Sequence, residues 1–196
     1  MDLAYRNEWL LRVDVPEFWT DPNLPGTSNQ SGMTDLFVRA GGRVYQIPGY
    51  AVFAAMDFTF PTAVYPALGF GKYTIGPTVA TARVFPHLDS FIFGILQNQV
   101  SVGGDPSRKD VDFLRLNIIW NTVWAERWWT QASANFDVDW ERKARTGMTL
   151  EFEGGWSITQ DWRVFLHPGV GLWGRDLAGN YDWIMQVGVR RMFPSF

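Results

Sequence analysis

The sequence has no cysteine, which excludes a disulfide scaffold, thiol catalysis and a zinc–thiolate site. It also has no uninterrupted apolar run of about 18 residues, so no transmembrane helix is expected. Neither charge is in strong excess, because 17 Lys and Arg stand against 20 Asp and Glu, for a net charge of −3. That balance argues against a nucleic-acid-binding protein. The length of 196 residues suits one domain with a full core or one closed barrel.

The first 15 residues lack the basic start and the apolar stretch of a signal peptide. An outer-membrane protein needs such a signal for export. If the chain is one, we expect that the signal has been removed or that the sequence is a fragment.

Residues 111–140 contain two long arms in which polar and apolar side chains alternate. In the first arm Leu114, Leu116 and Ile118 share one face, whereas Arg115 and Asn117 share the other. This period of two predicts β-strands with unlike faces. The AER connection between the arms is too short for anything but a hairpin. Each arm is longer than the roughly 5–6 residues usual for strands of soluble proteins.

The same pattern along the whole chain predicts ten strands, although the facing of residues 73–85 is ambiguous. The predicted strands span residues 4–15, 35–45, 50–60, 73–85, 90–102, 111–124, 128–140, 146–158, 162–173 and 181–193.

The connections between these strands are sorted by length. Counted from the N-terminus, the short connections (IPG, PHL, AER and TQD) are the second, fourth, sixth and eighth. Because successive antiparallel strands run in opposite directions, all four lie at the same end of the sheet. The long ones, 16–34, 61–72 and 103–110, lie at the other end. Outer-membrane barrels have short periplasmic turns, long extracellular loops and an even strand number. A lipocalin-like soluble barrel also alternates, with its apolar face inward, but has no reason to sort its loops.

The sequence therefore predicts an all-β protein, with residues 1–196 forming one closed antiparallel transmembrane β-barrel of about ten strands in the bacterial outer membrane. Both termini would lie at the periplasmic end. Aromatic residues make up 16% of the chain, and membrane barrels use aromatics as interfacial girdles. We expect the following tryptophans, all near strand ends, at the membrane interface: Trp124, Trp128, Trp129, Trp140, Trp156, Trp162 and Trp173.

Three segments resemble motifs of one bacterial outer-membrane family, the phenol-degradation-pathway (MetA-like) transporters. They are SGMTDLFVRAGGRVY at 31–45, FPT at 60–62 and LGFGKYTIGPTVA at 68–80. Thr34 stands where the family usually has a second Gly. Family members are longer, so a missing N-terminal hairpin would raise the strand count to twelve. The last strand, ending in Phe193, resembles the aromatic-ended last strands of outer-membrane proteins. The resemblance implies a barrel that admits small compounds, aromatic or apolar ones among them, and supplies no catalytic residues.

The polar faces of the strands would line the lumen with both signs of charge. We expect these lumen-lining residues: Arg39, Arg43, Asp57, Arg115, Asn117, Asp137, Asp139, Glu151, Glu153, Arg163, His167 and Arg190. The hairpin places Arg115 opposite Asp137, and charges in a narrow barrel normally pair across strands. The carboxylates of strands 128–140 and 146–158 could instead bind a hard cation. We favour ion pairs and expect no metal.

Catalysis is not expected. His167 should face the lumen as a polar residue beside Glu153. The nearest lumen-facing serine, Ser133, would lie two strands away, at about 10 Å. A nucleophile and its base need hydrogen-bond contact. The glycines at 69, 71 and 76 are not followed by the Lys-Ser/Thr of a phosphate loop. We therefore predict neither an enzyme nor a cofactor.

Two functions stay open. The first is a passive outer-membrane conduit for small molecules, with a narrow, charge-paired lumen. The second is a structural or partner-binding barrel with a filled lumen and no transport. Both require outer-membrane lipids, and the second adds a protein partner. Lumen width separates them, because about eight strands give an interior filled by side chains and about 16–18 leave an aqueous channel.

Overall fold

A computed structural model describes residues 2–5, 8–20, 30–125, 127–175, 177 and 180–191. The predicted end of the last strand, including Phe193, lies outside these residues. Among the described residues, no helix has the length and apolar character needed to cross a membrane.

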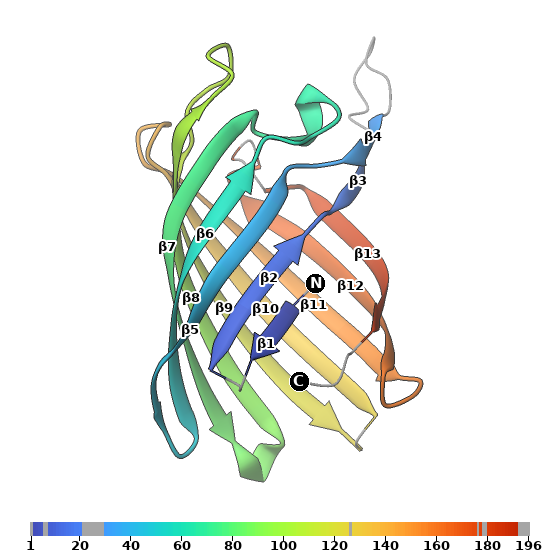
Figure 1. The fold of residues 1–196 in the computed structure, drawn as a ribbon. Helices are drawn as coiled ribbons and strands as arrows, with labels where there is room; N and C mark the ends of the chain where they lie inside the picture. The colour runs from blue at the N-terminus through green and yellow to red at the C-terminus, as the bar shows by residue number, and fades with distance from the viewer. Residues whose placement is uncertain are drawn as a thin grey trace.

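One antiparallel sheet of eleven strands makes up most of the structure (Figure 1). Strands that follow one another in the chain are neighbours in this sheet, except that β3 and β4 form a separate pair. The large sheet contains β1 (Asp2–Tyr5), β2 (Trp9–Asp14), β5 (Leu36–Ile47), β6 (Tyr50–Phe60), β7 (Lys72–Phe85), β8 (Ser90–Gly104), β9 (Asp112–Trp124), β10 (Trp128–Asp139), β11 (Arg145–Ser157), β12 (Trp162–Trp173) and β13 (Trp183–Arg191). The predicted all-β antiparallel architecture is confirmed, and β2 with β5–β13 corresponds to the ten predicted strands.

The N-terminal region departs from the prediction in two places. The strand expected over residues 4–15 is divided into β1 and β2, which pair as a hairpin. Alternation continues through both segments, so the pattern does not reveal the reversal between them. The predicted loop 16–34 contains a second hairpin, formed by β3 (Glu17–Thr20) and β4 (Gln30–Met33). Strands of four residues are too short to establish a period.

The connections separate by length between the two ends of the sheet, as predicted (Figure 1). The turn at residues 48–49 and the 3₁₀ turn η2 (Pro86–Leu88) lie at the lower end in this view. The long segment that contains η1 (Pro66–Leu68) and the segment 105–111 lie at the upper end. β2 therefore begins, and β13 ends, at the short-turn end.

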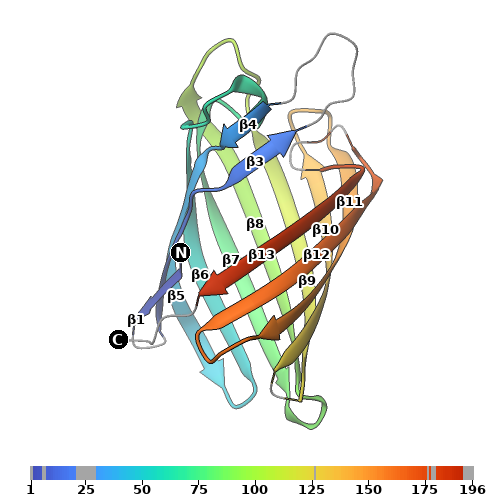
Figure 2. The ribbon, with the colours of Figure 1, turned by 90° about the vertical axis from the view of Figure 1, so that its right-hand side faces the viewer.

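The sheet is strongly curled, so that β2 lies in front of β9 and β10 in Figure 1 and the edge strand β13 turns toward β1 and β2 in Figure 2. Side chains from strands as far apart in the sheet as β2 and β11 line a common cavity. We call the surface around this cavity the inner face and the opposite surface the outer face. Among the described residues, no pairing joins β13 to β1 or β2.

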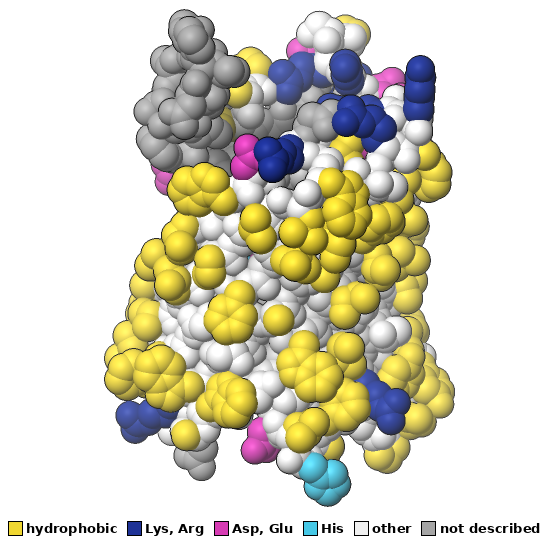
Figure 3. Space-filling model, turned by 180° about the vertical axis from the view of Figure 1, so that it is seen from behind, with side chains coloured by type: hydrophobic (Ala, Val, Ile, Leu, Met, Phe, Trp, Pro, Cys, Tyr) yellow, Lys and Arg dark blue, Asp and Glu magenta, His cyan; other side chains and the backbone are white. Residues whose placement is uncertain are grey.

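Polar residues lie inside and apolar residues lie outside. Among the described residues, five apolar side chains and fourteen polar or charged ones are buried, the reverse of a soluble protein. The outer face exposes large apolar side chains, for example Leu116 at 38%, Phe152 at 49% and Val187 at 77%. They form a band across the middle of the molecule, with charged groups gathered toward its two ends (Figure 3). The apolar face therefore does not point inward, as it would in a lipocalin-like barrel.

The same division settles the facing of β7, which the sequence left ambiguous. Thr74 and Thr78 are 2% and 3% exposed and share the inner face with Ala80, whereas Val79 is 47% exposed on the outer face.

Candidate functional site

Two arginine–aspartate pairs cross neighbouring strands on the inner face. Arg115 of β9 lies directly opposite Asp137 of β10, and its Nε and Nη2 donate to the two carboxylate oxygens at 2.6 and 3.2 Å. Arg39 of β5 holds Asp57 of β6 in the same way, at 2.6 and 2.8 Å. The predicted pairing of Arg115 with Asp137 is confirmed. In both pairs the aspartate is buried and a two-pronged contact compensates its charge.

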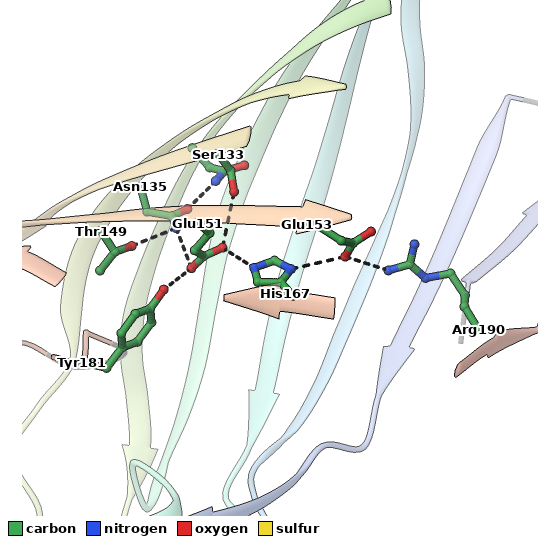
Figure 4. Close-up of polar contacts among 9 residues, drawn as sticks. Ser133, Asn135, Thr149, Glu151, Glu153, His167, Tyr181 and Arg190 are labelled. Atoms are coloured by element: carbon green, nitrogen blue, oxygen red, sulfur yellow. Dashed lines mark hydrogen bonds and ion pairs between the residues drawn. The ribbon is translucent and has the colours of Figure 1, made fainter. Parts of the chain in front are cut away.

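A network of polar side chains surrounds Glu151 of β11 (Figure 4). One carboxylate oxygen accepts hydrogen bonds from the Tyr181 hydroxyl at 2.5 Å and the Asn135 amide at 3.0 Å. The other lies 3.0 Å from Nε2 of His167 and accepts a hydrogen bond from Ser133 at 3.4 Å. All four groups therefore converge on Glu151, which is saturated with partners.

His167 of β12 bridges two carboxylates. Its Nδ1 lies 3.2 Å from Glu153, as its Nε2 lies 3.0 Å from Glu151. The expected position of His167 beside Glu153 is confirmed. Ser133 contacts Glu151, which stands between this hydroxyl and the imidazole. The network thus provides no Ser–His contact of the kind that activates a nucleophile.

Trp129 is a correction to the predicted outer ring of tryptophans. It is 9% exposed, and its indole N–H donates to Glu153 on the inner face at 2.8 Å. Gly155 lies opposite Trp129 on β11, where an added Cβ would come within 2.0 Å of the indole ring. The absence of a side chain at Gly155 therefore lets the ring lie along the sheet. Trp129 follows the parity of the polar residues of β10, which is the signal that its Trp-rich surroundings obscured.

The other six predicted tryptophans lie on the outer face and are 42–54% exposed. They are Trp124 (54%), Trp128 (50%), Trp140 (50%), Trp156 (42%), Trp162 (43%) and Trp173 (43%). Trp128 and Trp156 stack on neighbouring strands with ring centroids 4.7 Å apart. Their location at a membrane interface stays a prediction.

The remaining predicted lumen residues also lie on the inner face, with weaker pairing. Asn117 donates a hydrogen bond to Asn135, and Asp139 lies 3.4 Å from Arg142. Arg43 lies 3.8 Å from Glu8.

Arg163 and Arg190 lie directly opposite each other on β12 and β13. Arg190 lies 3.5 Å from Glu153 and its guanidinium sits over the Phe165 ring, whereas Arg163 sits over Trp129. Within the described part of the chain, Nε of Arg163 is buried without a hydrogen-bond partner. This end of the inner face therefore combines aromatic rings with positive charge.

The central feature of the inner face is a cavity of about 800 Å³. Its wall includes both paired arginines, Glu151 and several side-chain amides. The amide-bearing residues are Gln97, Gln99, Asn117, Gln131 and Asn135.

A cap formed by residues 66–70 bounds this cavity toward the long-loop end. Arg108 donates to the carbonyl oxygens of Pro66 and Gly69 at 2.6 and 2.5 Å. Asp35 accepts hydrogen bonds from the backbone N–H groups of Phe70 and Ala63 at 2.6 and 3.1 Å. These contacts hold the cap in place. No local pattern in the sequence marks Arg108 or Asp35, because each acts on a distant segment.

The loop between β8 and β9 is attached to the sheet by an ion pair. Lys72 lies 2.9 Å from Asp110, and its hydrogen bond and positive charge lower the pKa of that carboxyl. Over the part of the chain that the structure describes, no cluster of three or more potential metal ligands is found.

A scan of protein-family models and a search of curated proteins both find no match to the chain. The resemblance to the MetA-like family therefore stays a prediction.

Proposed function

We propose that the curled sheet closes into a transmembrane β-barrel of the bacterial outer membrane and acts as a passive conduit for small molecules. The observation that carries this proposal is the inverted distribution of side chains. Polar and charged residues make up most of the lining of a cavity of about 800 Å³, and large apolar groups face outward. Exposing these apolar side chains to water would be unfavourable, whereas the hydrocarbon chains of a bilayer would solvate them.

The outer surface has further features that suit acyl chains. A hollow of about 570 Å³ lies across β9–β12 and is lined mainly by apolar side chains, among them Trp120, Leu150 and Phe152. Membrane barrels carry such an apolar band between aromatic girdles.

Closure follows from the proposed surroundings. The free edges of β1 and β13 carry backbone N–H and C=O groups that lipid cannot hydrogen-bond, and each unsatisfied group would cost several kcal/mol. A sheet in a bilayer therefore closes. About ten strands place the lumen close to the size that side chains can fill.

The lumen of this barrel would conduct poorly and with little charge selectivity. Single-sign rings of charge confer ion selectivity, but here Arg39 and Arg115 are each paired with an aspartate. In a narrow barrel these long paired side chains would also obstruct the path. We expect low conductance from the unmodified protein.

The test is conductance in planar bilayers and solute flux in liposome swelling. Replacing Arg115 and Asp137 together by alanine should widen the path and raise flux. The matched control replaces Leu116 and Phe136, an opposite pair on the outer face of the same two strands, by alanine; it should leave flux unchanged. A large conductance from the unmodified protein would overturn the obstructed lumen. An unchanged flux in the inner double variant would show that this pair is not the barrier.

A second candidate function is a structural or partner-binding barrel with a filled interior. The cluster of Trp129, Arg163, Phe165 and Arg190 at the short-turn end favours it, because these bulky side chains lie on the inner face. Absence of flux from both the unmodified protein and the inner double variant would select this function.

A further inference from the structure

Two amides on the cavity wall lack partners within the protein. Gln97 of β8 and Gln131 of β10 both line the cavity and are half-buried. Neither side chain has a hydrogen-bond partner among the described residues. A nearby amide, Gln99, makes one long contact of 3.5 Å with Thr59. Each glutamine offers two N–H donors and a carbonyl acceptor, so the cavity presents free groups of both kinds.

Most charged side chains on the cavity wall are already paired, and Asp35 accepts hydrogen bonds from two backbone N–H groups. Arg39 and Arg115 each hold an aspartate through two hydrogen bonds, and the Arg12 guanidinium lies 2.7 Å from Asp14. Glu151 is occupied by its four partners. An ionic ligand would give up its hydration without meeting an unpaired countercharge, a desolvation penalty that uncharged ligands avoid.

We propose that the cavity binds an uncharged, hydroxyl-rich molecule of monosaccharide to disaccharide size, with Gln97 and Gln131 as its hydrogen-bonding residues. A hydroxyl group both donates and accepts, and thus matches a side-chain amide. The volume of about 800 Å³ lies within the range of small-molecule sites. Phe37 and Phe113 also line the cavity and would contact the apolar side of a sugar or an aromatic ring alike. An aromatic ring with a single hydroxyl would, however, leave most of the half-buried amide groups unpaired, which disfavours its binding. This inference rests on the proposed function, for which it names the class of solute.

The first test compares three probes on the unmodified protein in detergent micelles by saturation-transfer NMR. Glucose is uncharged and hydroxyl-rich, gluconate has similar size and hydroxyl groups but carries a negative charge, and phenol is aromatic. We expect binding in the order glucose, gluconate, phenol. Preferential binding of gluconate would make this an anion site, and preferential binding of phenol an aromatic site. Either order would overturn the proposal.

The second test locates the site. Gln97→Leu and Gln131→Leu should each weaken glucose binding about fivefold to tenfold, the effect of one lost hydrogen bond. The matched control is Asn98→Leu, which changes an amide between Gln97 and Gln99 that lies opposite Leu114 on the outer face. This control should bind glucose normally. Unchanged glucose binding in both glutamine variants would also overturn the proposal, and the probe comparison stands independently should either variant fail to fold.

Binding in micelles requires no passage across a membrane, so the two proposals fail separately. Glucose binding without liposome swelling, even for the Arg115→Ala/Asp137→Ala variant, would refute the conduit and leave the binding site. Swelling that depends only on solute size, without detectable glucose binding, would refute the site and leave the conduit.

Discussion

Asp137 shows how the inner face tolerates buried charge. Its side chain is 3% exposed, and the Arg115 guanidinium lies 2.6 Å from it. The Arg115 side chain in turn lies over the Phe113 ring, 5.7 Å from its centroid. A buried carboxylate is costly unless a partner compensates it, so the charge of each residue in this pair depends on the other.

Removing one partner should therefore lower the free energy of unfolding more than removing both. We expect Arg115→Ala to lower the free energy of unfolding by about 3–5 kcal/mol, because it leaves Asp137 buried and uncompensated. Arg115→Ala/Asp137→Ala should lose less. Urea unfolding of the protein refolded into vesicles, followed by far-ultraviolet circular dichroism, measures both changes. Equal or greater loss in the double variant would show that Asp137 is not energetically coupled to Arg115.

Two adjacent isoleucines of β9 allow a test of which face of the strand meets lipid. Ile118 is 44% exposed on the outer face, whereas Ile119 lines the cavity. The two residues have the same side chain and neighbouring positions, and differ in the face to which they belong.

Arginine at these two positions should have opposite consequences. Ile118→Arg places a charge against lipid and should cost about 2–4 kcal/mol near the bilayer midplane. Ile119→Arg places the same charge in the polar cavity and should refold into vesicles almost normally. The fraction of protein refolded into lipid, measured by heat-dependent gel mobility, compares them. Efficient refolding of Ile118→Arg together with failure of Ile119→Arg would mean that lipid does not cover the outer face.

The whole molecule has two unlike ends. Short turns join the strands at one end, and the cap and the long segments lie at the other (Figure 1). In the proposed membrane orientation the long segments face the cell exterior and the short turns face the periplasm.

Protease added to intact cells should therefore cut only in residues 16–34, 61–72 and 103–110. Within these ranges we expect slower cleavage at 66–70 and at Arg108, because hydrogen bonds from Arg108 join the two segments and Asp35 holds Phe70. Mapping the fragments by mass spectrometry locates the cuts. In permeabilised cells, which serve as the control, trypsin should also reach Arg127 in a short turn. Cleavage of intact cells confined to the short turns would reverse the orientation.

Local pattern was sufficient for most of the sheet. Alternation with period two depends on neighbouring residues alone, so the sequence predicted β6 and β12 with their observed bounds. It also predicted which charges share a face. The contact between Arg115 and Asp137 could be predicted because a short hairpin turn sets the register of β9 and β10.

What the sequence by itself determined was thus the strand order, the facing of most strands and the hairpin contacts, all of which follow from residues close along the chain. Only the tertiary structure decided the reversal between β1 and β2, the inward position of Trp129 over Gly155 and the capping of the cavity by Arg108 and Asp35. The unpaired amides of Gln97 and Gln131 also belong to this group. These features depend on which distant residues the curled sheet brings together, and a period of two carries no information about contacts beyond the neighbouring strand.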